Sequence, residues 1–237
     1  MAVDITELCK QNHTDKHRGE FPHSKLYDTL FASFRDQPIC LLEIGINRGG
    51  SIPVWEQYFP NAKLLMVDIN PISLLRTTDR TKIELVDQSD AEALKNYADN
   101  NGPFNIIIDD GSHLTGDQII TFETLWPYIL PGGVFVIEDT LTSYSGIYKF
   151  NYINSNITCV DYFKLRIDDI NKTVKNRPKL YKDINTIIIK QNMIVITKRE
   201  KPESWMSGEQ VPHERDKAQA KKDLKFREDL KGSNNGE

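Results

Sequence analysis

The sequence predicts an α/β fold built on a mostly parallel sheet, and two patterns support this prediction. Five apolar runs recur with spacers long enough for helices, which is typical of a doubly wound parallel sheet with crossover helices. Near the C-terminus, two more apolar runs flank Gln191-Asn192 and predict an antiparallel hairpin at the sheet edge. We therefore expect seven strands. The runs are residues 39–44, 63–68, 82–87, 104–109 and 133–139, with hairpin runs at 186–190 and 193–198.

A helix is expected between the fourth and fifth runs. Ile119, Phe122, Leu125 and Trp126 lie three or four residues apart or side by side, as on one face of a helix, and Pro127 ends the pattern. We interpret this face as part of the core, and expect the whole order to be five β/α repeats, a polar insert and the hairpin.

Composition limits the classes of protein and partner. A chain of 237 residues with 39% apolar and 27% charged residues fits one main α/β domain. The formal net charge of −4 offers no general attraction to nucleic acid or to an anionic membrane, so we expect neither as a partner. No apolar run approaches a membrane span, and the first residues lack a signal-peptide core. Three widely spaced cysteines predict a reduced, cytoplasmic protein.

The first apolar run ends in a glycine-rich turn. Glu43 closes the run, Gly45 and Gly49 permit a tight turn, and Ser51 stands where a helix begins. Such a turn lets a nucleoside approach the backbone closely. Asn47 occupies the place of the second glycine in the dinucleotide pattern G-x-G-x-x-G, which argues against a pyrophosphate ligand.

Polar residues also end the next two runs. Asp68 ends the second run, where an acid is suitably placed for a ribose diol. Asp87 and Gln88 follow at the tip of the third. Any one of these has an ordinary structural explanation, but their occurrence at successive strand ends indicates a binding site.

Acidic residues gather at the ends of the fourth and fifth runs. Asp110, Glu138 and Asp139 come where ligands of open α/β sheets bind. Three converging carboxylates raise at least one pKa unless a cation lies among them, and oxygen ligands suit Mg²⁺ or a similar hard cation. His113, three residues after Asp110, is a candidate base, with helix capping as the alternative. Asp109 should point away from Asp110, and we leave its role open between structure and cofactor contact.

These residues resemble a known family. The patterns E-x-G-x-N-x-G-G-S at 43–51, "VDIN" and "DQSD" are similar to class I S-adenosylmethionine-dependent methyltransferases, which have a Rossmann-like sheet. With "HTDKHRGEFPHSKLYDTLF", "DDGSH" and "PGGVFVIEDTLTSY", the chain resembles the metal-dependent sugar O-methyltransferases that tailor macrolide and polyketide glycosides. The resemblance covers about residues 12–197.

The resemblance implies roles and boundaries. It implies that Asp110, Glu138 and Asp139 hold the metal and that His113 is the base, while Tyr144 is expected to line the acceptor pocket. Residues 1–36 form a cofactor-covering segment and 37–198 the methyltransferase domain; an insert at about 145–183 serves as a lid or acceptor region, and 199–237 form a polar tail expected to be disordered or frayed. The cofactor-binding candidates are Thr14, Lys16, Glu43, Gly45, Asn47, Gly49, Ser51, Asp68, Asp87, Gln88 and Asp109.

We therefore expect an S-adenosylmethionine- and Mg²⁺-dependent O-methyltransferase that acts on a sugar hydroxyl of a glycoside, polysaccharide or antibiotic precursor. A catechol-type O-methyltransferase is the nearest alternative, because the same metal geometry serves any vicinal diol. A nucleotide-sugar- or NAD-binding protein that transfers no methyl group, and a non-catalytic assembly subunit, are further alternatives that the acidic residues disfavour. The sequence leaves the oligomeric state open, with a homo-oligomer among the choices.

Overall fold

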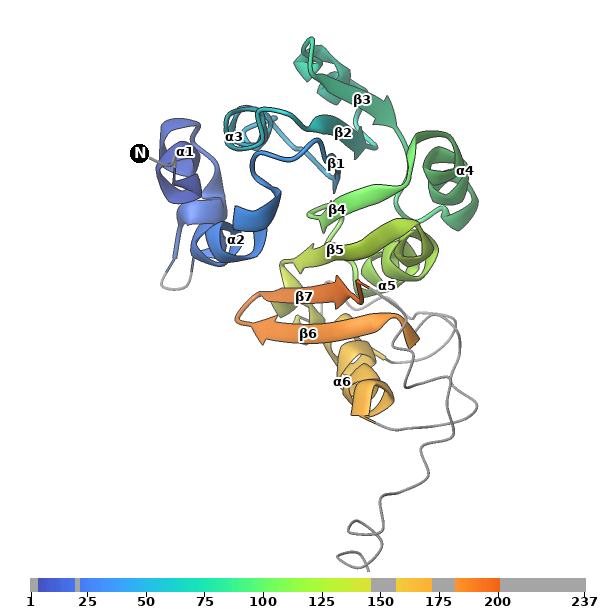
Figure 1. The fold of residues 1–237 in the computed structure, drawn as a ribbon. Coiled ribbons are helices and arrows are strands. Elements are labelled where there is room, and N and C mark those ends of the chain that lie inside the picture. The colour runs from blue at the N-terminus through green and yellow to red at the C-terminus, as the bar shows by residue number, and fades with distance from the viewer. Residues whose placement is uncertain (1–3, 20–21, 146–156, 172–181, 201–237) are drawn as a thin grey trace, which may run out of the picture. The chain divides into compact units, whose positions relative to one another are not determined.

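The computed structural model describes residues 4–19, 22–145, 157–171 and 182–200 (Figure 1). They form a seven-stranded sheet in the order β3-β2-β1-β4-β5-β7-β6. The pairs among β1 to β5 are parallel, and β7 runs antiparallel to both β5 and β6. The predicted fold class is therefore confirmed. The strands are β1 (Cys40–Ile44), β2 (Lys63–Asp68), β3 (Thr81–Leu85), β4 (Phe104–Asp109), β5 (Ile129–Glu138), β6 (Ile184–Lys190) and β7 (Met193–Lys198).

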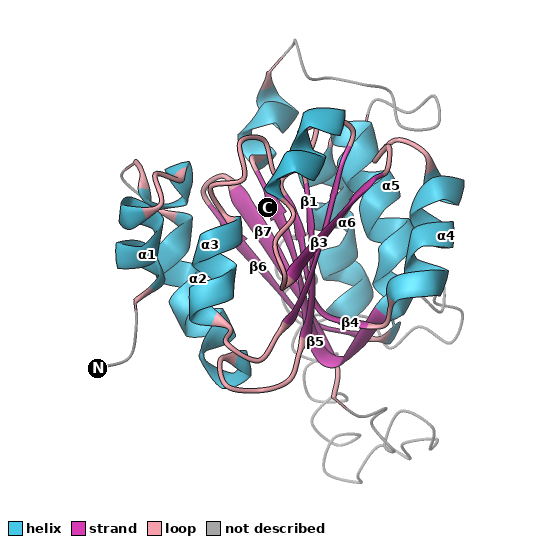
Figure 2. Ribbon diagram, turned by 90° about the horizontal axis from the view of Figure 1, so that it is seen from above, coloured by secondary structure: helices cyan, strands magenta, loops and turns pink. Residues whose placement is uncertain are grey.

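Helices cover both faces of the sheet (Figure 2). One face carries α1 (Ile5–Gln11), α2 (His23–Phe31) and α3 (Ile52–Tyr58). The other carries α4 (Ala91–Asn101), α5 (Thr115–Leu125) and α6 (Cys159–Asn171). Each layer buries its own apolar cluster against the sheet, so the core has two halves. The short 3₁₀ turns are η1 (Asp15–His17), η2 (Ala32–Phe34), η3 (Pro71–Arg76), η4 (Trp126–Tyr128) and η5 (Thr140–Tyr144).

Strand alternation decides which face each strand-end residue reaches. In β4, Ile106 and Ile108 join the cluster under α1–α3, whereas Ile107 joins the cluster under α4–α6. Asp109 ends β4 on the same face as Ile107, and Asp110 follows on the opposite side. The two aspartates consequently have different neighbours.

The predicted core helix is present, but two expectations about elements need correction. All four residues of its apolar face are buried, with Trp126 lying just past the end of α5 in η4. The spacer between β2 and β3 is the 3₁₀ turn η3 and not an α-helix. Ile72 and Leu75 there are 63% and 82% exposed, so a helix would gain little from packing. In addition, β5 begins at Ile129, four residues before the predicted start, with a register shift against β4.

Aromatic packing fixes the N-terminal segment, residues 4–34, on the sheet. Tyr27 stacks on Phe31 with ring centroids 4.9 Å apart and meets Trp55 of α3 edge-on at 5.6 Å. Phe31 also contacts Phe59, which follows α3. This packing holds the segment against the sheet, and Lys16 of η1 contacts Asp110 and Glu138 at the carboxyl ends of the strands.

Several expectations concern residues outside the described part of the chain. The predicted tail lies there from residue 201 onward, as do residues 146–156 and 172–181 of the predicted insert. None of the described helices is both long enough and apolar enough to span a bilayer.

Candidate active site

A cleft of about 950 Å³ opens at the carboxyl ends of the parallel strands. It is centred where β1 and β4 meet, which is the point where the strand order reverses and where open α/β sheets bind ligands. The volume is in the range of small-molecule sites. The predicted site residues that line it are Thr14, Lys16, Gly45, Asn47, Ser51, Asp68, Asp87, Gln88, Asp110, His113 and Asp139.

Five other predicted site residues do not line this cleft. Glu43 lies beneath it, fully buried, where it accepts hydrogen bonds from Ser51 Oγ at 2.6 Å and Trp55 Nε1 at 3.0 Å. It thus braces the turn after β1 from below. Tyr144, at the end of η5, is 67% exposed. The residues outside the lining are Glu43, Gly49, Asp109, Glu138 and Tyr144.

The turn after β1 forms part of the cleft wall. Gly45 has φ +80°, and a Cβ atom there would lie 2.4 Å from the carbonyl oxygen of Asp110. The backbone amide of Ile46 donates to Asp68 Oδ2 at 2.9 Å, which ties the turn to the end of β2. Because Gly45 has no side chain, the turn after β1 can pack directly against the backbone of the loop after β4.

Gln88 holds the loop after β4 from inside the protein. Its Nε2 donates to Asp109 Oδ1 at 2.6 Å, and its Oε1 accepts from the backbone amide of Ser112 at 2.8 Å. Burial raises the pKa of Asp109 to about 7. These contacts favour the structural alternative for Asp109, and they orient the loop that leads to His113.

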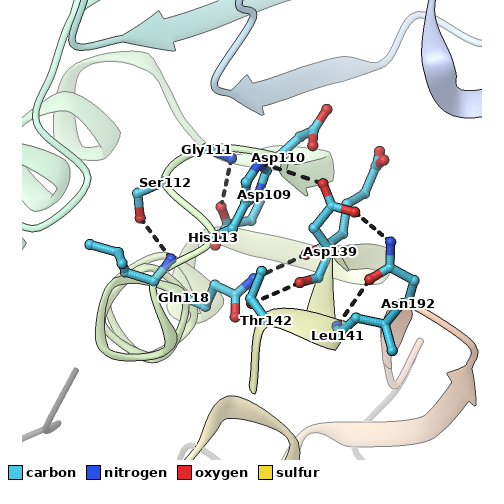
Figure 3. Close-up of polar contacts among 12 residues, drawn as sticks. Asp109, Asp110, Gly111, Ser112, His113, Gln118, Asp139, Leu141, Thr142 and Asn192 are labelled. Atoms are coloured by element: carbon cyan, nitrogen blue, oxygen red, sulfur yellow. Dashed lines mark hydrogen bonds and ion pairs between the residues drawn. The ribbon is translucent and has the colours of Figure 1, made fainter. Parts of the chain in front are cut away.

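The loops after β4 and β5 bring together three side chains that could bind a metal ion (Figure 3). His113 and Asp139 both adopt left-handed backbone conformations, with φ of 58° and 54°. Their side chains face each other, with His113 Nε2 3.5 Å from Asp139 Oδ2. One ligand atom each from Asp110, His113 and Asp139 lies within 4.8 Å of the others. We call these three residues the metal-ligand group.

The donor set fits a divalent cation. Two carboxylates supply the oxygen ligands that Mg²⁺ and Mn²⁺ prefer, and the remaining positions can be filled by substrate or water. The imidazole is compatible with either a ligand or a base. The group is partly exposed at the cleft, so that a cation and a substrate have access.

Glu138, predicted as the third metal ligand, lies apart from this group. Its carboxylate receives Lys16 Nζ at 2.6 Å and the hydroxyl of Tyr27, and His23 Nδ1 lies 2.8 Å from its other oxygen. Lys16 Nζ also lies 2.6 Å from Asp110 Oδ2. The predicted trio is therefore split between two neighbouring clusters that share Asp110.

The charges in this second cluster support one another. Burial alone would lower the pKa of Lys16, but Asp110 and Glu138 hold it well above its usual range. Burial alone would raise the pKa of Glu138, but Lys16 and His23 hold it well below its usual range. Burial and the charge of Glu138 raise the pKa of Asp110. Converging carboxylates were expected to collect a cation, and here the chain itself supplies one.

Two contacts were not predicted from the sequence. The first is the position of the Lys16 ammonium among the carboxylates; only the family resemblance pointed to Lys16, and it pointed to the cofactor. The second is Asn192 in the β6–β7 turn, whose Nδ2 donates to Asp139 Oδ1 across 53 positions of sequence. A turn asparagine carries no sequence signal for such a distant partner.

Comparison with known proteins identifies the domain. Residues 42–140 match the family described as a methyltransferase domain. The chain is 34% identical over 173 residues to the 8-demethyl-8-alpha-L-rhamnosyl tetracenomycin-C 2'-O-methyltransferase of Streptomyces olivaceus, covering 70% of this chain and 45% of that protein. It is 36% identical over 150 residues to the mycinamicin VI 2''-O-methyltransferase of Micromonospora griseorubida, covering 60% and 37%.

A solved structure shows the same fold. The MycE methyltransferase of the mycinamycin biosynthetic pathway, in complex with Mg, SAH and mycinamycin VI, superposes with a TM-score of 0.81 at 27% identity, covering 92% of this chain and 59% of that one. The predicted resemblance to class I methyltransferases and to sugar O-methyltransferases is confirmed. The chain covers less than half the length of these two curated relatives.

Proposed function

We propose that the protein transfers a methyl group from S-adenosylmethionine to a hydroxyl of a sugar, with Mg²⁺ or a similar divalent cation. One observation carries the proposal. The cleft at the β1–β4 switch point opens directly onto the metal-ligand group, so a cofactor and a cation-held hydroxyl would meet at one place. The relatives named above act on sugars, and MycE was crystallised with Mg and SAH, which supports the same chemistry here.

The cleft residues have distinct tasks in this proposal. The Gly45 turn presents backbone to the cofactor, and Asp68 accepts hydrogen bonds from its ribose hydroxyls. Thr14 and Lys16, which line the cleft from the N-terminal side, support a covering role for residues 1–36. The sulfonium supplies an already activated methyl group, so the protein's contribution is alignment and exclusion of water.

The metal-ligand group prepares the acceptor. Asp110 and Asp139 would hold the cation, which when bound would supply Lewis-acid activation of the sugar hydroxyl. His113, which lines the cleft together with the two aspartates, takes the hydroxyl proton at Nε2. Loss of this proton leaves the oxygen able to attack the methyl carbon.

A panel assay tests the acceptor class. Labelled S-adenosylmethionine is incubated with Mg²⁺, the protein and either deoxysugar glycosides or catechols. We expect label in the glycosides. Transfer to catechols alone would contradict the sugar proposal while leaving the methyltransferase chemistry in place.

A variant separates the two possible roles of His113. If His113 is the base, His113→Ala lowers turnover by about 10²- to 10⁴-fold and leaves Mn²⁺ affinity within about threefold of the unmodified protein. If His113 is a metal ligand, His113→Ala instead weakens Mn²⁺ binding by about tenfold or more. Turnover and Mn²⁺ affinity are measured on the same preparation, and near-normal turnover would remove both roles.

The remaining expectations are also proposals. A small glycoside or glycan is the acceptor. The proposed reaction is the same whether the protein acts as a monomer or as a homo-oligomer. The cytoplasmic location is supported by Cys9, Cys40 and Cys159, all of which are free thiols as a reducing compartment requires.

A further inference from the structure

A lysine of the N-terminal segment lies at the point where three strands end. Lys16 Nζ is 2.6 Å from Asp110 Oδ2, 2.6 Å from Glu138 Oε1 and 3.4 Å from Glu43 Oε1. These carboxylates come from β1, β5 and the residue after β4, which are neighbouring positions in the sheet. The ammonium therefore lies where one cation can interact with all three carboxylates.

The ammonium is the main positive charge in a nearly dry environment. The side chains of Lys16, Glu43 and Glu138 are 3%, 0% and 4% exposed. Charges removed from water in this way need a partner of opposite sign, because an unpaired buried carboxylate is costly. Tyr27 and His23 complete the contacts of Glu138. Lys16 thus offsets part of the negative charge of the cluster in the structure described here.

Asp110 belongs both to this cluster and to the metal-ligand group. A divalent cation bound to Asp110 would share that carboxylate with the Lys16 ammonium. Only one carboxyl group would then separate the two cations. The Asp110 side chain is 23% exposed, so water screens part of the repulsion between two such cations, but both still draw on the same carboxylate charge. Occupancy of one position consequently weakens the other.

We infer that Lys16 is an internal cation that competes with the divalent metal for Asp110 and Glu138. Glu138 becomes available as a metal ligand only when Lys16 withdraws, so metal occupancy is coupled to the position of η1 and of the cofactor-covering segment. The inference rests on the proposed function only in requiring that a divalent cation binds at Asp110.

Removing the charge of Lys16 tests the inference. Lys16→Met keeps a long apolar side chain, and the packing of Tyr27, Phe31 and Trp55 still anchors the segment. Mn²⁺ affinity is measured without cofactor by electron paramagnetic resonance of the free ion. We expect Lys16→Met to bind Mn²⁺ at least about tenfold more tightly than the unmodified protein.

Two controls accompany this variant. Lys16→Arg keeps the positive charge and should stay within about threefold of the unmodified protein in Mn²⁺ affinity. Lys10→Met removes an exposed lysine that pairs with Glu7 on the same segment, away from the carboxylate cluster, and should leave Mn²⁺ affinity unchanged. Unchanged or weaker Mn²⁺ binding by folded Lys16→Met would overturn the competition alone. If neither protein bound Mn²⁺, the metal part of the proposed function would fail as well.

A measurement on the unmodified protein covers the case in which Lys16→Met does not fold. Amide hydrogen exchange is compared with and without Mn²⁺. Competition predicts faster exchange in η1 and α2 when the metal is bound, because the contacts of Lys16 with Asp110 and Glu138 weaken. Equal or slower exchange in these two elements would overturn the inference.

Discussion

At the scale of single residues, the position of Asp139 depends on a contact from a distant hairpin. Asp139 has a left-handed backbone, and Asn192 donates to its carboxylate from the β6–β7 turn (Figure 3). The same Asn192 accepts from the backbone amide of Leu141 at 2.9 Å, so one amide side chain orders both the carboxylate and the start of η5. A proposed metal ligand is thus aimed by an element that never touches the metal.

Asn192→Gly removes this contact without disturbing the turn. Asn192 has φ 62°, which glycine adopts without strain. We expect Mn²⁺ affinity to fall by about tenfold, the effect of losing one hydrogen bond to a charged group. Mn²⁺ titration checks this, with Gln191→Gly in the same turn as the control. Equal affinities in both variants would show that Asp139 needs no support from the hairpin.

Asp109 makes stability depend on pH. Burial raises its pKa in the folded protein to about 7, from an ordinary value of 3.8. A raised pKa favours the folded state at low pH, and this contribution is lost as pH rises toward 7. In chelator, we expect the free energy of unfolding to fall by about 2–3 kcal/mol between pH 5 and pH 8 relative to Asp109→Asn. Urea denaturation at both pH values measures it, and parallel pH profiles would contradict the assignment.

At the scale of elements, the contact between the β1 turn and the β4 loop is testable with two glycines. Gly45 and Gly19 have φ of +80° and +82°, but a Cβ atom meets backbone only at Gly45. Alanine in the left-handed backbone conformation destabilises the folded protein by about 1–2 kcal/mol at either position. We expect Gly45→Ala to lose at least about 2 kcal/mol more than Gly19→Ala in urea denaturation, because the Asp110 backbone must move. Equal losses would mean that the two loops are not in firm contact.

Elements with a buried face were predictable from the sequence, and those without one were not. The runs at 104–109 and 193–198 correctly predicted strands because most of their residues are buried in the sheet, five of six in β4 and four of six in β7. The spacer before β3 has the length of a helix and several apolar residues, but those residues remain exposed. Length and composition alone therefore overestimate helices at the sheet edge.

At the scale of the whole molecule, the place of the site was predictable but its internal contacts were not. Parallel strands bring their carboxyl ends to one edge, so Asp68, Asp87 and Asp110 had to gather there. Strand alternation separates Glu138 from Asp139 just as it separates Asp109 from Asp110. The same argument applied to β5 would have predicted the split. The contact of Lys16 is different, because it depends on how the N-terminal segment packs, and no local pattern encodes that.

In the proposed function, the carboxylates act on the acceptor through a metal, and the cofactor binds independently of that metal. The most direct test measures methyl transfer to an accepted glycoside and SAH affinity by calorimetry, on one preparation, in excess chelator and after Mg²⁺ is restored. We predict that turnover disappears in chelator and returns with Mg²⁺, that Asp139→Ala abolishes it, and that SAH affinity changes by less than about threefold throughout. Full turnover in excess chelator, or a large loss of SAH affinity there, would contradict this division of roles.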